Sequence, residues 1–338
     1  MKFWYSSIIN ANSHISQTKK TLRIWNNIHF KAKTSLYKDV SSAEIAVQVF
    51  RQLESEDFRT LNIIEAAMSK REFVPTAQIK KFSKLPMDRI QFSLSKLNKL
   101  GLIYQTKGAY IGHTLNYAGY DCLAINSLVK AGVIESFGQP LGVGKEADVY
   151  DAISQNGKRI AVKFHRLGRT SFRQTRRKRG YMREHSSWLF QSHLAAEREF
   201  HAMQIAYKNG ISVPEPISQN RHVIAMGIIE GGELSRYRKI EKPERVLKEI
   251  LRNIRKTYVK AHIIHADLSE YNIILKPDGH IQIIDWPQYV NTEHANAQGL
   301  IERDLKNVLT FFNRRFKTKI QMKEATDYVT GKARSLTI

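Results

Sequence analysis

Residues 262–286 decide the fold, and they read His262-Ile-Ile-His265-Ala-Asp267-Leu-Ser-Glu-Tyr-Asn272-Ile-Ile-Leu-Lys-Pro-Asp278-Gly-His-Ile-Gln-Ile-Ile-Asp285-Trp286. Two apolar runs, 273–275 and 281–284, flank a Pro-Asp-Gly turn, which predicts a hairpin with polar side chains at both ends. A carboxylate and an amide on one loop, followed by a second carboxylate beyond the second strand, suit phosphoryl transfer. Asp267 would orient the attacking hydroxyl, while Asn272 and Asp285 would hold magnesium on nucleotide phosphates.

Composition and charge narrow the class of protein. The 338 residues include 54 Lys and Arg against 31 Asp and Glu, which gives a net charge of +23. This length allows two or three domains. The charge favours polyanionic partners such as nucleic acid, although a solvated basic surface is the alternative. The single cysteine, Cys122, excludes an internal disulfide and a thiolate metal site. Because no apolar run approaches the roughly 18 residues of a membrane span, we expect a cytoplasmic protein with no membrane partner.

The N-terminal part of the chain predicts a helical domain with a short hairpin. Residues 1–40 mix aromatic and basic side chains and are interpreted as a basic N-terminal extension. From residue 41 onward, helices with apolar residues at helical spacing precede two short strands, which is typical of a winged helix-turn-helix domain. We assign this domain to 41–131. Its helices include the predicted segments 58–71, 76–82 and 120–130.

The recognition helix of this domain would be 87–99. Its outward side is predicted to carry Arg89, Gln91, Ser95, Lys96 and Lys99. That face is expected to contact DNA or RNA. The alternative is that these charges are only the solvated side of an amphipathic helix, with the wing docked on protein.

Residues 137–167 predict three strands, with a glycine-bearing first turn and an Asn-Gly second turn. A glycine turn alone is weak evidence, because any tight hairpin uses glycine. A lysine inside the third apolar strand, Lys163, is more informative, since a buried lysine is costly unless it is paired. Its partner would be Glu199 on a following amphipathic helix, with Glu197 as the alternative, unless either acid only pairs on the surface.

Two further segments complete the expected site. The most basic stretch, 166–183, is predicted to be a mobile loop that becomes ordered on phosphate-rich surfaces or near the nucleotide, with a purely solvated loop as the alternative. A later strand runs into a glycine turn, where backbone groups around Met226 to Ile228 would hydrogen-bond adenine and Glu230 would lie at its edge. The segment 299–316 is predicted to be helical.

The parts occur in the order found in a protein-kinase-like phosphotransferase: glycine-rich hairpin, strand lysine, helix glutamate, hinge, His-x-Asp loop, Asn and Asp. One feature departs from a typical protein kinase. Trp286-Pro287 follow Asp285 in place of Phe-Gly, and only residues 286–338 remain. We therefore expect a compact two-lobed domain that lacks an activation segment and the peptide-binding subdomains.

Four strings give the sequence a close resemblance to the RIO atypical serine/threonine kinases, and to the second subgroup of that family, whose members carry an N-terminal winged helix. The resemblance covers about residues 45–318. The strings are Gly142-Val-Gly-Lys-Glu-Ala-Asp-Val-Tyr150, Lys163-Phe-His-Arg-Leu-Gly-Arg-Thr-Ser-Phe172, His265-Ala-Asp-Leu-Ser-Glu-Tyr-Asn272 and Ile284-Asp-Trp-Pro-Gln-Tyr289.

The resemblance implies an α+β fold, with the winged helix followed by a RIO kinase domain. The expected boundaries are an N-lobe over 132–227, a C-lobe over 228–320 and a C-terminal tail over 321–338. The implied cofactors are ATP and Mg2+, with Mn2+ as an alternative metal.

Roles for individual residues also follow from the resemblance. Lys163 would bind the phosphates, Asp267 would be the catalytic acid, and Asn272 and Asp285 would be the magnesium ligands. Asp285 would also accept a transient aspartyl phosphate. The loop expected over ATP contains Gly142, Val143, Gly144, Lys145, Glu146, Ala147 and Val149. Ala147 stands where the subgroup usually has Ser, and it lacks the hydroxyl that would contact phosphate.

The implied function is assembly of small ribosomal subunits, with ATP hydrolysis cycling the protein on and off the precursor and its rRNA. A small-molecule kinase of the aminoglycoside or choline type is an alternative, but it would need a larger acceptor pocket and leaves the winged helix unexplained. A nucleic-acid-binding regulator that uses the kinase lobe as a nucleotide sensor is another. The intact set of Lys163, Asp267, Asn272 and Asp285 argues against that second alternative.

Overall fold

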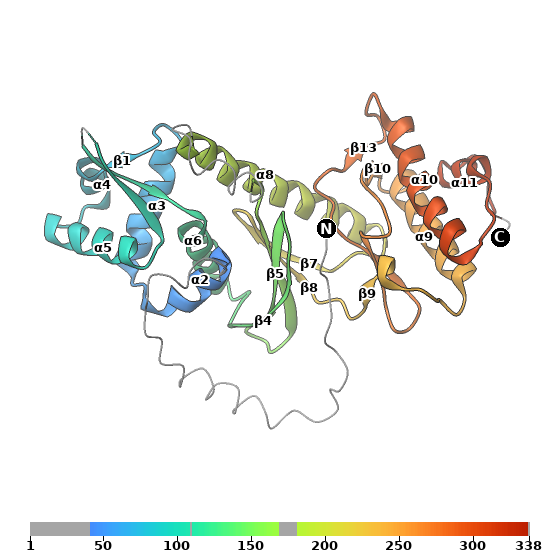
Figure 1. Cartoon of the computed structure of the whole chain (residues 1–338), viewed down its shortest axis with the longest axis horizontal. Coiled ribbons are helices and arrows are strands. Elements are labelled where there is room, and N and C mark those ends of the chain that lie inside the picture. Colours follow the sequence, from blue (N-terminus) through green and yellow to red (C-terminus); the bar gives the residue numbers. More distant parts are fainter. Residues whose placement is uncertain (1–40, 109, 169–180, 337–338) are drawn as a thin grey trace, which may run out of the picture.

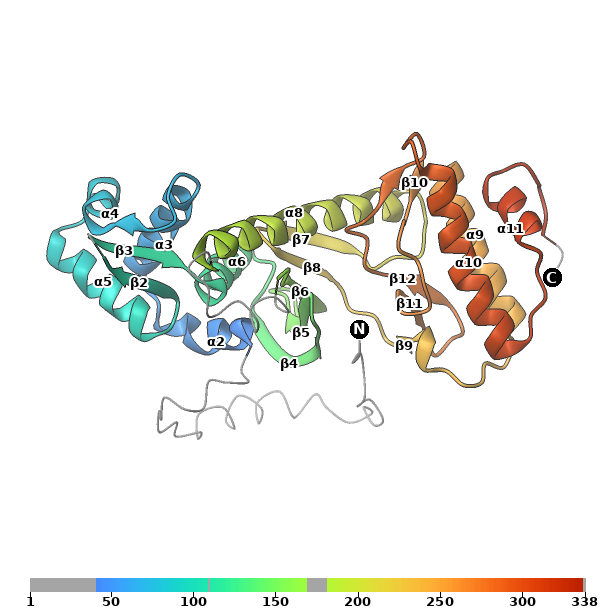
Figure 2. The ribbon, with the colours of Figure 1, turned by 45° about the horizontal axis from the view of Figure 1, so that its top comes forward.

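The computed structural model describes residues 41–108, 110–168 and 181–336, so the predicted extension 1–40 lies outside the described residues. Three units follow one another: a winged-helix unit, a five-stranded N-lobe and a C-lobe built mainly from helices (Figure 1). The long helix α8 (Tyr181–Lys208) runs from the winged-helix unit past the sheet to the C-lobe (Figure 2). The predicted α+β class is confirmed.

The winged-helix unit combines a helical core with a three-stranded sheet of order β1-β3-β2. Its elements are α2 (Ser42–Val49), η2 (Phe50–Gln52), α3 (Ser55–Met68), β1 (Val74–Pro75), α4 (Thr76–Ser83), α5 (Met87–Lys99), β2 (Ile103–Lys107), β3 (Ile111–Leu115) and α6 (Tyr117–Lys130). Helices α3 and α6 begin three residues before their predicted starts. Glu54 and Asp57 form a reciprocal capping box at α3, and the Asn116 side chain accepts the Gly119 amide at α6.

The outward face of α5 carries less free charge than the sequence predicted. Lys96 Nζ donates to Asp57 Oδ2 at 2.7 Å, and Asp57 is buried in α3. Arg89 Nε donates to Glu56 Oε2 at 3.0 Å. Two of the five predicted nucleic-acid contacts are therefore ion pairs within the domain, and Lys96 is only partly exposed. The exposed side chains of this face include the paired Arg89 together with Gln91, Phe92, Ser95, Asn98 and Lys99.

The N-lobe is one antiparallel sheet of order β4-β5-β6-β8-β7. Its strands are β4 (Ser136–Val143), β5 (Ala147–Ile153), β6 (Arg159–His165), β7 (Pro216–Asn220) and β8 (Val223–Gly227). The first three confirm the predicted three strands. The turn between β4 and β5 is closed by the Gly144 amide, which donates to the Ala147 carbonyl at 2.8 Å.

Both faces of this sheet are covered by other parts of the chain, as the side chains of strand β6 show. Ile160, Val162 and Phe164 belong to the hydrophobic cluster that includes the winged-helix core. Ala161 belongs to the other cluster, which contains α8 and the C-lobe core. Since side chains alternate across a strand, one strand joins both cores. Each large apolar side chain buried in this way contributes about 1.5–3 kcal/mol, so the winged-helix unit and the N-lobe stabilise each other.

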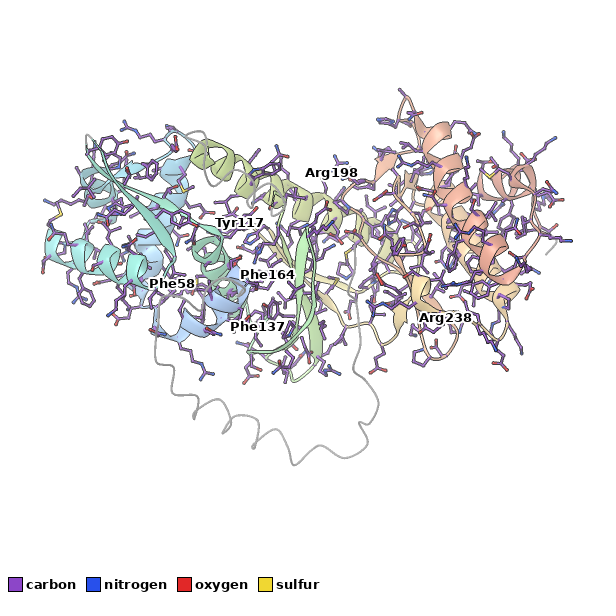
Figure 3. The ribbon with its side chains drawn as sticks, in the orientation of Figure 1. Phe58, Tyr117, Phe137, Phe164, Arg198 and Arg238 are labelled. Carbon is purple, nitrogen blue, oxygen red and sulfur yellow. The ribbon has the colours of Figure 1, made fainter. Side chains whose placement is uncertain are left out.

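Buried charges reinforce the contact between the winged-helix unit and the sheet. Arg166 donates to Asp121 Oδ2 of α6 at 2.8 Å, and Asp121 Oδ1 lies 2.6 Å from His222 Nε2. The Arg166 guanidinium also lies 5.1 Å from the centre of the Tyr117 ring and 5.2 Å from that of Phe164, two residues labelled in Figure 3. All three charged or polar partners are buried. The prediction that Arg166 opens a mobile basic loop was therefore wrong.

Most of the remaining basic stretch, residues 169–180, lies outside the described residues. Its last three residues, 181–183, form the first turn of α8. The proposed role of this stretch in binding phosphate-rich surfaces therefore stays a prediction.

The C-lobe contains the hairpin of the opening stretch and three helices. Its elements are β9 (Gly232–Glu233), η3 (Leu234–Arg236), α9 (Pro243–Val259), β10 (Ile263–Ile264), β11 (Ile273–Leu275), β12 (Ile281–Ile283), β13 (Val290–Asn291), α10 (Ala297–Phe316) and α11 (Met322–Val329). The predicted hairpin and the predicted helix over 299–316 are confirmed.

Helix α11 lies in the region assigned to a C-terminal tail. Ala325 and Val329 are fully buried in the C-lobe cluster, and the Arg255 guanidinium of α9 donates to the Ala333 carbonyl at 2.7 Å. The lobe therefore extends beyond the predicted boundary at residue 320. None of the helices in the described part of the chain is both long and apolar enough to span a bilayer.

The buried histidine in the Asp121 network makes stability depend on pH. Burial lowers the pKa of His222 to about 4, although Asp121 acts to raise it. An unfolded histidine has a pKa of about 6.5. As the pH falls from about 6.5 to about 4, the unfolded state therefore binds a proton that the folded state does not. The free energy of unfolding has its full value above this pH range and decreases by about 3 kcal/mol across it.

We expect His222→Gln, which keeps an N–H donor for Asp121 but does not titrate, to flatten this dependence. The measurement is the free energy of unfolding by denaturant at several pH values for the wild type and the variant. The same slope in both proteins would show that His222 is not the titrating group.

Candidate functional site

A cavity of about 590 Å³ opens between the N-lobe sheet, α8 and the C-lobe hairpin. Its size is in the range of small-molecule and cofactor sites. The predicted residues that line it are Gly144, Lys145, Glu146, Ala147, Val149, Lys163, Glu199, Met226, Asn272 and Asp285. The predicted residues Gly142, Val143, Ile228 and Asp267 are not among its lining.

Three charged side chains meet in this cavity. Lys163 Nζ donates to both carboxylate oxygens of Glu199, at 2.8 and 2.7 Å, and to Asp285 Oδ1 at 2.9 Å. Lys163 comes from β6, Glu199 from α8 and Asp285 from the end of the C-lobe hairpin. The predicted pairing of Lys163 with Glu199 is thus confirmed. The alternative acid, Glu197, has a side chain that is 63% exposed and lies 4.0 Å from His193.

The charges in this group fix each other's ionisation. Burial acts to raise the pKa of Glu199, but the charge of Lys163 and the contact with His165 outweigh it and lower that pKa to about 2. Burial acts to lower the pKa of Lys163, but Asp285 and Glu199 raise it above its usual value. Both groups are therefore charged at neutral pH. A permanently cationic lysine beside an open cavity suits an anionic ligand such as a phosphate chain.

The loop that begins at His265 is held by helix α10. Asp304 is buried and accepts the Ala266 amide at 2.8 Å and the Leu268 amide at 2.9 Å. Ala266 has a φ of +62°, a left-handed conformation that the two hydrogen bonds help to maintain. Between these two buried residues, Asp267 is exposed. Its carboxylate is therefore presented to solvent by a rigid loop, outside the lining of the cavity.

Asp285, at the end of the C-lobe hairpin, has an unusual backbone conformation. Its φ is +69°, in the left-handed region that costs a residue with a side chain about 1–3 kcal/mol. The neighbouring backbone is anchored, because the Ile284 amide donates to the Asn272 carbonyl at 2.9 Å. Trp286 is fully buried, and its Nε1 donates to the Ile283 carbonyl at 3.2 Å. Non-glycine residues in this conformation are found at functional sites, where surrounding contacts impose it.

Asn272 and Asp285 offer oxygen atoms suited to magnesium. The Asn272 amide nitrogen donates to the Asp267 carbonyl at 2.9 Å, which leaves its amide oxygen as the ligand atom. Among the residues that the structure describes, no group of three or more His, Cys, Asp or Glu side chains forms a metal cage. This donor set fits Mg2+, which binds through one or two protein oxygens and completes its shell with waters and substrate phosphates.

The end of the cavity expected to hold adenine differs from the prediction. Met226, Gly227 and Ile229 line it, whereas Ile228 does not. The Gly227 amide already donates to the Glu215 carbonyl at 2.8 Å. Glu230 is exposed and lies outside the lining. Ile228 and Glu230 therefore lie outside the lining, whereas Ile229 between them reaches the cavity, and the adenine contact of this segment stays a prediction.

Comparison with known proteins agrees with this arrangement. A RIO domain model matches residues 148–325, and a Rio2 N-terminal model matches residues 50–131. The chain belongs to the RIO kinase family. The second match, together with the winged-helix unit, confirms the predicted second subgroup.

Relatives and a solved structure extend over most of the chain. The RIO-type serine/threonine-protein kinase Rio2 of Methanocaldococcus jannaschii is 38% identical over 274 residues, which cover 78% of this chain and 100% of the relative. The serine/threonine-protein kinase rio2 of Dictyostelium discoideum is 37% identical, covering 80% of this chain and 52% of the relative. The chain thus spans about half the length of that protein. The crystal structure of the Rio2 kinase-ADP/Mg2+-phosphoaspartate complex from Chaetomium thermophilum matches with a TM-score of 0.72 and 33% identity, covering 84% of this chain and 89% of that one.

Sequence reasoning missed two residues that support the site. Asp304 lies within the helical series of buried positions 301, 305, 308 and 312, and an acid in such an apolar stripe was the available signal. Arg198 lines the cavity beside Glu199, but an arginine on an exposed helix turn gives no comparable signal.

We expect Asp304→Asn to slow ATP turnover about tenfold or more while ATP affinity changes by less than about threefold. The amide has one acceptor oxygen for two backbone N–H groups, so the loop carrying Asp267 loosens while Lys163 and Glu199 keep their contacts. The measurements are the turnover number and the dissociation constant for ATP. Glu302→Gln, an exposed change on the same helix, is the control. A parallel loss of affinity and turnover would contradict a role limited to the loop.

Proposed function

We propose that the chain is a magnesium-dependent ATPase and serine/threonine kinase that acts in the maturation of the small ribosomal subunit. The observation that carries the enzymatic part is the contact of one ammonium, Lys163 Nζ, with both Glu199 and Asp285 in a cavity that Asn272 also lines. An ATP phosphate chain brought to Lys163 would lie against both magnesium ligands. Magnesium supplies positive charge that neutralises the phosphate oxygens during transfer.

The family relative crystallised with ADP, Mg2+ and a phosphoaspartate supports Asp285 as the acceptor. In the proposed step an Asp285 carboxylate oxygen attacks the γ-phosphorus, and the bond between that phosphorus and the bridging β,γ-oxygen breaks. ADP leaves with the electron pair, and no proton has to be removed from the ionised carboxylate. Lys163 contacts Asp285 Oδ1, so Oδ2 is the oxygen assigned to the attack.

The aspartyl phosphate is then resolved by a second transfer. A water molecule attacks the phosphorus, the phosphorus–oxygen bond to Asp285 breaks, and the carboxylate is restored. Asp267 receives the proton of the water, and a serine or threonine hydroxyl would take the place of water in the kinase reaction. The exposed position of Asp267 is compatible with access for either nucleophile.

The ribosomal part of the proposal rests on charge and on family membership. A net charge of +23 favours a polyanionic partner such as rRNA. Within α5 the exposed residues Gln91, Ser95 and Lys99 are the proposed contacts with DNA or RNA, together with the basic stretch 166–183 apart from the buried Arg166. An ATP-driven cycle on a particle of this kind needs no deep peptide groove. Residues 286–296 lead from Asp285 directly to α10.

We expect Asp285→Asn to abolish the acyl phosphate, and Asp267→Ala to slow its hydrolysis so that it accumulates. The measurement is incorporation of labelled phosphate from ATP into a form that is stable in acid and released by hydroxylamine. Labelled phosphate that remains in Asp285→Asn would exclude this acceptor.

A wild-type protein with no ATP turnover in the presence of magnesium would overturn the enzymatic proposal. Co-purification of the Asp267→Ala protein with small-subunit precursors, and release by ATP, tests the ribosomal part.

RNA binding should weaken steeply with salt, because each phosphate contact releases condensed counterions. The slope of the logarithm of affinity against the logarithm of salt concentration should fall by about one in Lys99→Gln. Lys158→Gln is the control, because Lys158 is on the N-lobe and already pairs with Glu215 at 2.5 Å. A slope near zero for the wild type would remove the electrostatic argument for an rRNA partner.

A further inference from the structure

Two successive residues of α8 reach the two halves of the catalytic cavity. Glu199 pairs with Lys163 of the N-lobe, as described above. Arg198 turns to the C-lobe instead: its Nε donates to the Pro287 carbonyl at 3.0 Å and its terminal nitrogen donates to the Tyr289 carbonyl at 2.8 Å. The guanidinium also lies 5.3 Å from the centre of the Tyr289 ring. Figure 3 shows Arg198 on α8 where this helix meets the C-lobe.

The segment that Arg198 holds begins immediately after Asp285. The Tyr289 amide donates to the Trp286 carbonyl at 3.2 Å, so residues 286–289 form a closed turn. Buried Trp286 anchors one end of this turn, and Arg198 holds the outer carbonyls of the other end. Without both anchors the left-handed backbone of Asp285 would relax, since that conformation costs about 1–3 kcal/mol.

We propose that Arg198 is a positioning residue that orients Asp285 for metal binding and phosphoryl transfer through the 286–289 turn. The proposal rests on the proposed function for its catalytic consequence. A typical protein kinase orders the residues after the second Asp through an activation segment. Here α8 has that role. Glu199 orients Lys163, and Arg198, in the same helix turn, orients Asp285.

The geometry favours positioning over direct contact with phosphate. Arg198 lines the cavity, so a charge contact with the nucleotide is the competing role. Two of its nitrogens are already committed to carbonyl oxygens in a two-point arrangement that only a planar guanidinium provides. A lysine at this position would keep the charge but lose the two-point contact, and this difference separates the two roles.

The test compares Arg198→Met, Arg198→Lys and the control Glu197→Gln, which changes an exposed neighbour on the same helix. We expect both Arg198 variants to lower the turnover number for ATP about tenfold, with the dissociation constant for ATP changed by less than about threefold. Glu197→Gln should match the wild type in both measurements. Recovery of turnover in Arg198→Lys, or a weaker ATP affinity with normal turnover, would assign Arg198 to phosphate binding and overturn the proposal.

A second readout does not depend on catalysis. Amide hydrogen exchange at Tyr289 should accelerate at least about fivefold in both Arg198 variants and stay unchanged in Glu197→Gln. The turn that keeps the Tyr289 amide on the Trp286 carbonyl would no longer be held through its outer carbonyls. Unchanged exchange in the Arg198 variants would overturn the positioning role. Faster exchange in a protein whose wild type shows no ATP turnover would retain that role and place the failure with the proposed function.

Discussion

The constraint on which the site depends is the charge of Lys163 inside a buried strand. A buried ammonium must be paired, and removing one partner of a buried pair costs about 3–5 kcal/mol. Two of its contacts come from Glu199 on α8 and one from Asp285 on the C-lobe, so three separate elements meet at a single nitrogen atom. The need to balance this charge therefore fixes how the sheet, α8 and the C-lobe hairpin lie around the cavity.

Strand alternation then extends this constraint to the winged-helix unit. Lys163 and His165 face α8, so Phe164 and Arg166 must face the opposite side of the sheet. There Phe164 joins the hydrophobic cluster of the winged helix, and Arg166 pairs with Asp121 of α6. The Arg166 amide also donates to the Glu146 carbonyl at 2.6 Å, in the turn that lines the nucleotide cavity. The winged-helix unit is consequently part of the support of the catalytic site.

How far the sequence could predict this arrangement depends on the range of each interaction. The hairpin around Gly279 and the pairing of Lys163 follow from local turn chemistry and from the cost of burying charge, and both were predicted correctly. Lys96 and Arg166 were placed wrongly as free basic residues, because their partners, Asp57 and Asp121, lie 39 and 45 positions away in sequence. Periodicity along one strand or helix contains no information about such distant partners. Asp304 stands out in the sequence as an acid in an apolar stripe, but its partners, the Ala266 and Leu268 amides, lie 38 and 36 positions away and could not be predicted.

A kinase site without an activation segment must obtain its order from elements that are already part of the core. The buried indole of Trp286 anchors the segment after Asp285 in the core, and Arg198 holds the same segment from α8. Arg198 binds backbone carbonyls and Trp286 is held by burial, so neither contact requires a covalent modification of a loop. A site ordered in this way has its Asp285 carboxylate in place before a nucleotide binds, which reduces the conformational cost of binding.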